Sequence, residues 1–218
     1  PWDIRYLTEI YRTEEYGYSK EEVKEYFPLD LVLDGMFGIC ESLYGITVEE
    51  VDDKVVWHPD VRLFRISDEA DGTTLSYLYL DLYPREGKYN HFVIFGLVNG
   101  RLTEEGYAEP VAAIIGNFNP PQDGKPSLLT IDELLIIFHE MGHAKHNLLT
   151  RAPYGTLSGS NVERDFAETP SQAFEEWIYD PAIMESISGH YTDPEQKIPP
   201  DLRDRVIASA DFGKGDTY

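Results

Sequence analysis

The sequence predicts an α+β fold, in which a small, mostly antiparallel sheet packs against helices. Apolar residues recur at helical spacing in residues 19–44 and again in residues 130–149. Between these regions, residues 61–118 change to an alternation with a period of two, which is typical of strands. We expect one domain with helices in residues 1–50, the sheet in residues 55–118 and further helices in residues 130–180.

Two helix starts are marked by capping boxes, in which an N-cap hydroxyl and a glutamate three residues later bond each other's backbone N–H groups. They are Ser19 with Glu22, and Thr130 with Glu133. A further amphipathic stretch, Leu31 to Leu43, predicts a helix that ends near Gly45, since glycine readily adopts the conformation that closes a helix. The helix that opens at Thr130 should run to about Leu149.

Four strands are predicted from the alternation of side chains. They are residues 61–66, 75–83, 91–98 and 110–118. Asp71-Gly72 predicts a turn between the first two strands, because this pair favours the tight turns of hairpins. Residues 119–126 are rich in proline and glycine, and they predict a loop before the helix at Thr130.

The start of the next helix has two interpretations. Ser160 with Glu163 could open it, but Pro170 would then lie in its interior, where proline loses a hydrogen bond and clashes with the preceding turn. Alternatively, the helix starts at Thr169 and has Pro170 at its first position. Both interpretations stay open at this point.

The chain is strongly acidic: 18 lysines and arginines against 40 aspartates and glutamates give a formal net charge of −22. Such a surface repels phosphate backbones and anionic lipids, so we expect no nucleic-acid or membrane partner. Cys40 is the only cysteine, which excludes an internal disulfide. We expect a cytoplasmic location. A mitochondrial one is the alternative, because the chain begins at Pro1 and would lack a targeting segment.

The strongest chemical signal is a His-Glu-x-x-His pattern formed by His139, Glu140 and His143. Residues four apart on a helix lie on one face, so both imidazoles can reach one metal ion. Glu140 lies beside the metal's open side, where it can take a proton from zinc-bound water. The apolar lead, residues 134–138, indicates a buried helix, on which unpartnered polar groups would be costly. We therefore predict a zinc site with Glu140 as the general base.

His146 lies on the same face of that helix, but about 10 Å from His139 along the axis, so the two cannot share a tetrahedral zinc. We expect His146 to pack near the site. A third ligand is needed, and Glu163, Asp165 and Glu168 are candidates. Asp165 and Glu168 could face the site together, one binding the metal and the other orienting a histidine. The alternative is a solvated acidic face.

The chain resembles the family of thimet oligopeptidase and neurolysin, which also includes oligopeptidase A and mitochondrial intermediate peptidase. The resemblance is carried by residues 138–146, 157–172 and 177, and it extends to residues 26–28, 57–58, 81–89, 112–118 and 190–191. It implies a zincin-like core and one Zn²⁺ per chain. The implied ligands are His139, His143 and Glu168, with Glu140 as the base and Asp165 bonded to a ligand.

The implied activity is that of a zinc metalloendopeptidase, an oligopeptidase that hydrolyses internal bonds of short peptides. Peptides can bind such enzymes as an added strand on a sheet edge. The small residues Ala112, Ala113 and Gly116 could let a peptide approach, although an ordinary core strand is the alternative interpretation. A zinc aminopeptidase, and an inactive zinc-bearing structural piece, are the alternatives for the activity.

Members of the family are several times longer, and later helices supply a histidine and tyrosines that stabilise the tetrahedral intermediate. This chain stops at Tyr218, before those residues should appear. We therefore expect it to be one piece of a larger peptidase, to be nearly inactive alone and to have further segments of the same enzyme as partners.

Overall fold

The computed structural model describes residues 2–211, which divide into two compact units. One unit combines Met36–Pro120 with Leu135–Glu175, and it contains the sheet and all the predicted site residues. The other unit takes the remaining described residues. No helix in this described range is both long and apolar enough to span a membrane.

The unit without the sheet is helical. It includes α1 (Trp2–Tyr16), α2 (Lys20–Lys24), α7 (Pro181–Ser186) and α8 (Pro200–Ala208), and buries apolar residues such as Phe27 and Leu129. The predicted cap of α2 is confirmed, because the backbone N–H of Glu22 donates to the Ser19 hydroxyl at 3.1 Å. Helix α8 was not anticipated. It begins at Pro200, where the fixed φ of proline suits the first turn.

Helix α3 (Leu29–Tyr44) ends where the sequence indicated. Gly45 follows it with a φ of 60°, a conformation that glycine adopts without strain. The chain then enters β1 (Ile46–Glu50), within the range expected to be helical. Ile46, Thr47 and Val48 are β-branched and fit a pleated, half-buried surface better than a helix.

The sheet has five strands in the order β1-β2-β3-β7-β4. Besides β1, they are β2 (Arg62–Asp68), β3 (Thr74–Asp81), β4 (Val93–Val98) and β7 (Val111–Ile115). Only the β3–β7 pair is parallel, so the prediction of an α+β fold with a mostly antiparallel sheet is confirmed. A separate hairpin, β5 (Arg101–Thr103) with β6 (Gly106–Ala108), follows β4.

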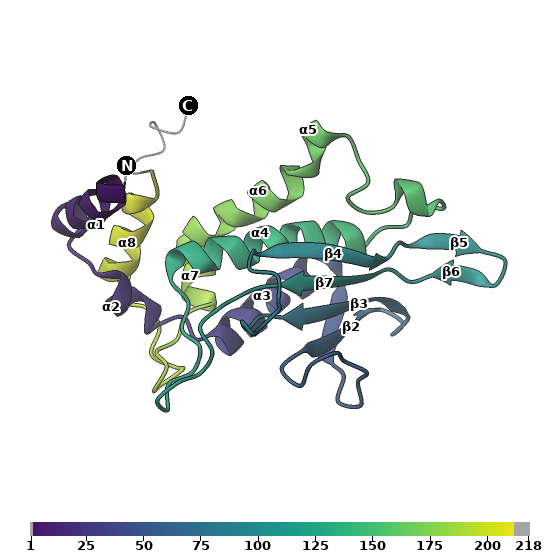
Figure 1. The fold of residues 1–218 in the computed structure, drawn as a ribbon, viewed down its shortest axis with the longest axis horizontal. Helices are drawn as coiled ribbons and strands as arrows, with labels where there is room; N and C mark the ends of the chain where they lie inside the picture. The colour runs from purple at the N-terminus through teal and green to yellow at the C-terminus, as the bar shows by residue number, and fades with distance from the viewer. Residues whose placement is uncertain (1, 212–218) are drawn as a thin grey trace. The chain divides into compact units, whose positions relative to one another are not determined.

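Two helices lie against the sheet within this unit, α4 (Ile131–Leu148) and the second half of α3 (Figure 1). Side chains from both helices and from the strands meet around one small interior cavity. They include Cys40 of α3, Met141 and Leu148 of α4, and Ile66 and Leu78 of the strands. The apolar face of α4 is thereby held on the sheet, and its polar face is left for the histidines.

The strand order corrects the peptide-binding role suggested for Ala112, Ala113 and Gly116, and the alternative interpretation, an ordinary core strand, is the one observed. Strand β7 has β3 on one side and β4 on the other, and Ala112 and Ala113 are buried. Gly116 is also engaged, because its N–H donates to the backbone oxygen of Asp81 at 2.8 Å and its carbonyl accepts from Lys88 at 2.5 Å. The edge on this side of the sheet is β4.

Candidate metal centre

Helix α4 presents the predicted metal-site residues. Its capping box is confirmed: the Glu133 carboxylate accepts from the N–H of Thr130 at 2.8 Å, and the Thr130 hydroxyl accepts from the N–H of Glu133 at 3.3 Å. One and a half turns of apolar residues follow before His139. His139 and His143 then lie one turn apart on the same face.

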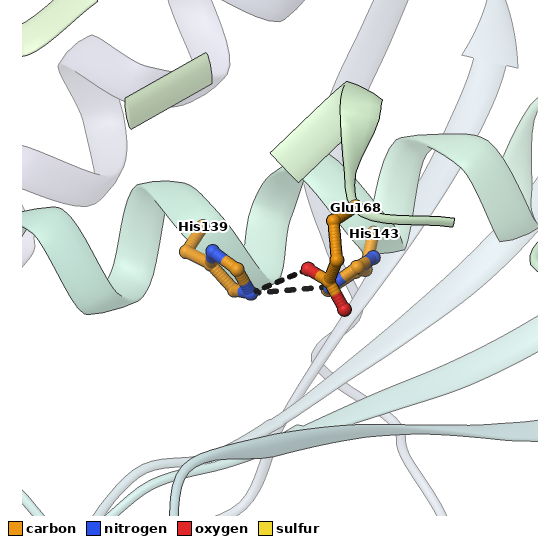
Figure 2. Close-up of side chains that lie close together, drawn as sticks. All are labelled: His139, His143 and Glu168. Atoms are coloured by element: carbon orange, nitrogen blue, oxygen red, sulfur yellow. Dashed lines mark hydrogen bonds and ion pairs between the residues drawn. The ribbon is translucent and has the colours of Figure 1, made fainter. Parts of the chain in front are cut away.

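The two histidines and Glu168 form a compact cluster, although Glu168 lies on a different segment (Figure 2). The Nε2 atoms of His139 and His143 are 3.1 Å apart. Oε2 of Glu168 lies 3.4 Å from Nε2 of His139 and 3.1 Å from Nε2 of His143. Three potential ligand atoms thus form a nearly equilateral triangle.

The triangle has the dimensions that a tetrahedral metal requires. Nitrogen and oxygen ligands about 2.0–2.1 Å from a tetrahedral zinc lie about 3.3 Å from one another. The observed separations of 3.1–3.4 Å bracket this value. The residues therefore fit a metal ion with three protein ligands, and a fourth position would remain for water or substrate.

Glu168 reaches the cluster from the turn between two short helices, α5 (Arg164–Ala167) and α6 (Thr169–Glu175). Of the two predicted starts for this helix, the one at Thr169 is observed: α6 begins there and has Pro170 in its first turn. The hydroxyl of Ser171 lies 2.9 Å from Oε2 of Glu168 and 2.8 Å from its backbone oxygen. Ser171 is buried, so this contact ties the half-exposed Glu168 carboxylate to a fixed point.

Gly142, within the His-Glu-x-x-His pattern, allows α4 and α6 to touch. A Cβ atom at this position would lie 2.7 Å from the carbonyl oxygen of Pro170 and 2.9 Å from the backbone nitrogen of Ser171. Neither backbone atom can move without shifting α6. A glycine is therefore needed here to bring Glu168 to the histidines.

The free nitrogen of His139 bonds to Glu175, which the sequence analysis did not identify. Nδ1 of His139 contacts Oε1 of Glu175 in a short hydrogen bond. Because an ionised carboxylate can only accept, Nδ1 must carry the proton, and the lone pair of Nε2 is left facing the cluster. Glu175 therefore selects the tautomer of His139 that can bind a metal.

Asp165 was expected to orient a histidine, but it lies on α5, before the turn that carries Glu168. Its side chain is exposed, and no hydrogen bond or ion pair between residues 2 and 211 joins it to His139 or His143. The restart of the helix at Thr169 accounts for this difference. Glu175 lies seven residues beyond Glu168, about two helical turns, and this spacing was the available signal.

Glu140 is buried beside the cluster, with 8% of its surface exposed. Burial raises the pKa of its carboxyl group, although His139 and the backbone N–H of Ile94 each lower it in part. The backbone N–H of Ile94 lies close enough to this carboxylate to influence its pKa, so the edge strand β4 runs next to the histidine-bearing face of α4. A cleft of about 480 Å³ adjoins His139 and Glu140, with Phe92, Leu135 and Ile136 among its walls.

The remaining histidines of α4 differ in their roles. Burial lowers the pKa of His143, which favours the neutral imidazole that a metal requires. His146 lies outside the cluster, and its ring meets Phe166 edge-on at a centroid distance of 6.1 Å. Burial lowers the pKa of His146 as well.

The fold and the cluster together define an α+β protein with a two-histidine, one-carboxylate metal site and a buried glutamate beside it. Comparison with known proteins gives the family: the chain belongs to peptidase family M3, whose model matches residues 1–218. The predicted resemblance to thimet oligopeptidase and oligopeptidase A is thereby confirmed.

Three relatives illustrate the similarity. The chain is 39% identical to a thimet-like oligopeptidase of Dictyostelium discoideum over 95% of its own length, and 40% identical to oligopeptidase A of Escherichia coli over 97%. It is 37% identical to a dipeptidyl carboxypeptidase of Salmonella typhimurium over 98% of its length. In each case the match covers 31% of the relative, so the chain spans about a third of the length of these relatives.

Proposed function

We propose that this chain carries the zinc site and general base of a metalloendopeptidase that hydrolyses internal bonds of short peptides. The observation that carries this proposal is the tetrahedral spacing of His139, His143 and Glu168 beside the buried carboxylate of Glu140. Two imidazole nitrogens and one carboxylate oxygen form a donor set that suits zinc. A purely structural zinc is less well supported, since such sites are usually closed by four protein ligands.

When bound, zinc would polarise the peptide carbonyl and lower the pKa of a bound water to about 7. Glu140 would take a proton from the water whose oxygen attacks the carbonyl carbon, and would deliver it to the amine nitrogen as the C–N bond breaks. The N–H of Ile94 lies beside the Glu140 carboxylate, and burial makes this carboxylate a stronger base than an exposed glutamate. His143 and Glu168 act as ligands, and His139 is oriented by Glu175.

The peptide is proposed to bind along β4, the edge of the sheet. Its apolar side chains Phe95, Leu97 and Val98 are exposed, and on its outer side it has no strand partner among the described residues. A peptide added antiparallel to β4 would run from Val98 towards Val93 and pass Glu140 near Ile94. This arrangement, an edge strand beside the metal-bearing helix, supports a zincin-like core.

In this direction the residue that follows the cleaved bond would reach the cleft near Phe92 and Ile136. The apolar walls of this cleft suit an apolar or aromatic side chain.

The replacement Glu140→Gln, made in the complete enzyme, tests the mechanism. It should leave the metal in place and lower kcat by about 10²- to 10⁴-fold, the usual contribution of a general base. Metal content and cleavage of an internally quenched peptide would be measured on the same preparation. Cleavage at the parental rate would refute the assigned role of Glu140.

A second candidate activity is the removal of dipeptides from a free carboxyl terminus, because one relative is named a dipeptidyl carboxypeptidase. An aminopeptidase is the other alternative. Peptides that are blocked at both ends separate the three activities, since only an endopeptidase cleaves them. Cleavage only after the carboxyl end is freed would favour the dipeptide-releasing activity.

A further inference from the structure

A second groove lies at the far end of β4, away from the cleft at Phe92. It has a volume of about 710 Å³ and is lined by the end of β4, the start of β5 and residues 153–156. Leu97, Leu102 and Tyr154 contribute exposed apolar walls. Because Leu97 belongs to β4 itself, the groove continues the edge along which the peptide is proposed to bind.

Arg101 gives this groove a positive charge in a strongly acidic chain. No carboxylate belongs to the groove's lining, and within residues 2–211 Arg101 forms no ion pair. Among the described residues its one hydrogen bond is long, 3.4 Å from Nη1 to the backbone oxygen of Asn99. By contrast, Arg62 and Arg85 are each paired with a carboxylate at 2.7 Å. The guanidinium of Arg101 is therefore available to a ligand.

The distance along the strand fixes which part of a peptide could reach Arg101. Ile94 lies beside Glu140, and Arg101 follows seven residues later (101 − 94 = 7), beyond the end of β4 at Val98. In an antiparallel pair the two chains advance equally, and an arginine side chain spans the length of about two strand residues. Arg101 would thus meet a peptide residue about five to nine positions before the cleaved bond.

We propose that Arg101 and its groove form a distal specificity site that selects an acidic side chain about five to nine residues before the cleaved bond. The inference rests on the proposed peptidase function, and it adds a substrate class to it. The apolar walls from Leu97 and Tyr154 would hold the aliphatic part of the side chain or its neighbour.

The test uses the complete enzyme and peptides blocked at both ends that carry a single Glu, Gln or Lys at each of about positions four to ten before the bond. The parent should cleave the Glu peptide about two- to fivefold faster in kcat/KM than the Gln peptide at the selected position, as expected for an exposed charge pair. Arg101→Ala should abolish this preference, and Arg101→Glu should reverse it in favour of Lys. The preference should weaken as salt is added, because the pair is exposed.

Arg151→Ala is the matched control. Arg151 is exposed, donates to the backbone oxygen of Thr150 at 2.8 Å and lies over Tyr107, outside the groove. The variant changes the net charge by the same amount as Arg101→Ala, so it should keep the preference for Glu. Equal losses in the two variants would mean a long-range charge effect, and would overturn the proposal.

Binding of the same peptides to the Glu140→Gln variant separates this inference from the proposed function. Tighter binding of the Glu peptide that depends on Arg101, together with no cleavage by the parent enzyme, would support the groove and overturn the peptidase. Cleavage without any preference would support the peptidase and overturn the groove. Neither cleavage nor discrimination would overturn both.

Discussion

Two side chains shape the metal site by touching its ligands. Glu175 contacts Nδ1 of His139, and the hydroxyl of Ser171 lies 2.9 Å from Oε2 of Glu168. Each contact fixes the direction of a ligand atom before a metal arrives. A ligand that is already oriented loses less freedom on binding, so these contacts should contribute to metal affinity.

We expect Glu175→Ala to weaken zinc binding by about 10- to 100-fold, because His139 would lose the bond that sets its tautomer. Competition with a chromogenic chelator measures this change independently of activity. Asp165→Ala is the matched control, since this exposed carboxylate has no described contact with His139 or His143 and should leave the affinity unchanged. An equal loss of zinc affinity in both variants would contradict the assigned role of Glu175.

Most of the residue-level site was accessible from the sequence. The roles of His139, His143 and Glu140 were predicted from their spacing on one helix. The role of Glu168 as the third ligand was implied by the family resemblance. Glu175 was missed because its position depends on the start of α6 at Thr169, and the sequence allowed two starting points. Which side chain bonds to the metal-binding His139 therefore depends more on where α6 starts than on the type of residue.

At the scale of elements, the contact between α4 and α6 depends on Gly142. Gly142→Ala should force the two helices apart, displace Glu168 and lower both zinc affinity and thermal stability. Gly38→Ala is the control, since its added Cβ would meet nothing within 4 Å and a helical Ala is favoured over Gly by about 0.5–1 kcal/mol. If Gly142→Ala bound zinc as tightly as Gly38→Ala, the close contact would not matter.

The loop that joins β3 to β4 is held by a buried carboxylate. Asp81 accepts from Arg85 at 2.7 and 2.8 Å and from Trp57 at 2.8 Å, and it pairs with Lys88 at 2.9 Å. Burial alone would raise the pKa of Asp81, but the bonds from Arg85, Lys88 and Trp57 outweigh it and hold the pKa well below its usual range. For Lys88 the balance is opposite, since burial lowers its pKa more than Asp81 raises it.

Asp81→Asn should lower the free energy of unfolding by about 3–5 kcal/mol at neutral pH, because Lys88 and Arg85 lose a buried partner. The carboxylate stabilises the fold fully above its unfolded-state pKa of 3.8, and this contribution is lost as the pH falls towards the lower folded-state pKa. Urea unfolding should therefore show a difference between parent and variant that is large at pH 7 and shrinks in acid.

The control for Asp81 is Glu49→Gln, which removes an exposed pair with Arg65. This variant should change the free energy of unfolding little, because exposed pairs are weak and screened. A similar loss in both variants at neutral pH, or a loss in Asp81→Asn that does not depend on pH, would contradict the assignment.

Element types were more predictable than element neighbours. The capping box at Thr130 and the alternation in residues 91–98 gave α4 and β4 with nearly their observed bounds. The sequence did not reveal that β7 inserts between β3 and β4, since side-chain alternation says nothing about which strands are adjacent. The peptide-binding edge was therefore expected on β7.

At the scale of the whole molecule, the relatives are about three times as long as this chain. We propose that further segments of the same enzyme complete the substrate site, and we expect the chain alone to cleave peptides poorly. Loss of a single oxyanion donor costs about 10²- to 10³-fold in rate. Native and denaturing intact mass, with a peptide assay on the same sample, checks this. Efficient cleavage by a monomer of 24.9 kDa would refute it.

The parallel pairing of β3 with β7 has a consequence for how the molecule folds. Tyr77 faces Val111, so the pair closes a loop of 34 residues (111 − 77), and β4 lies inside that loop. Strand β4 is joined to the sheet only through β7, so it reaches its place in the sheet only when the non-local β3–β7 pair has formed. Such pairs form slowly, because closing the loop costs chain entropy before the stabilising contacts of the pair are made. The N–H of Ile94 should therefore reach Glu140 late in folding, and a refolding chain should acquire helical signal well before it can bind a peptide.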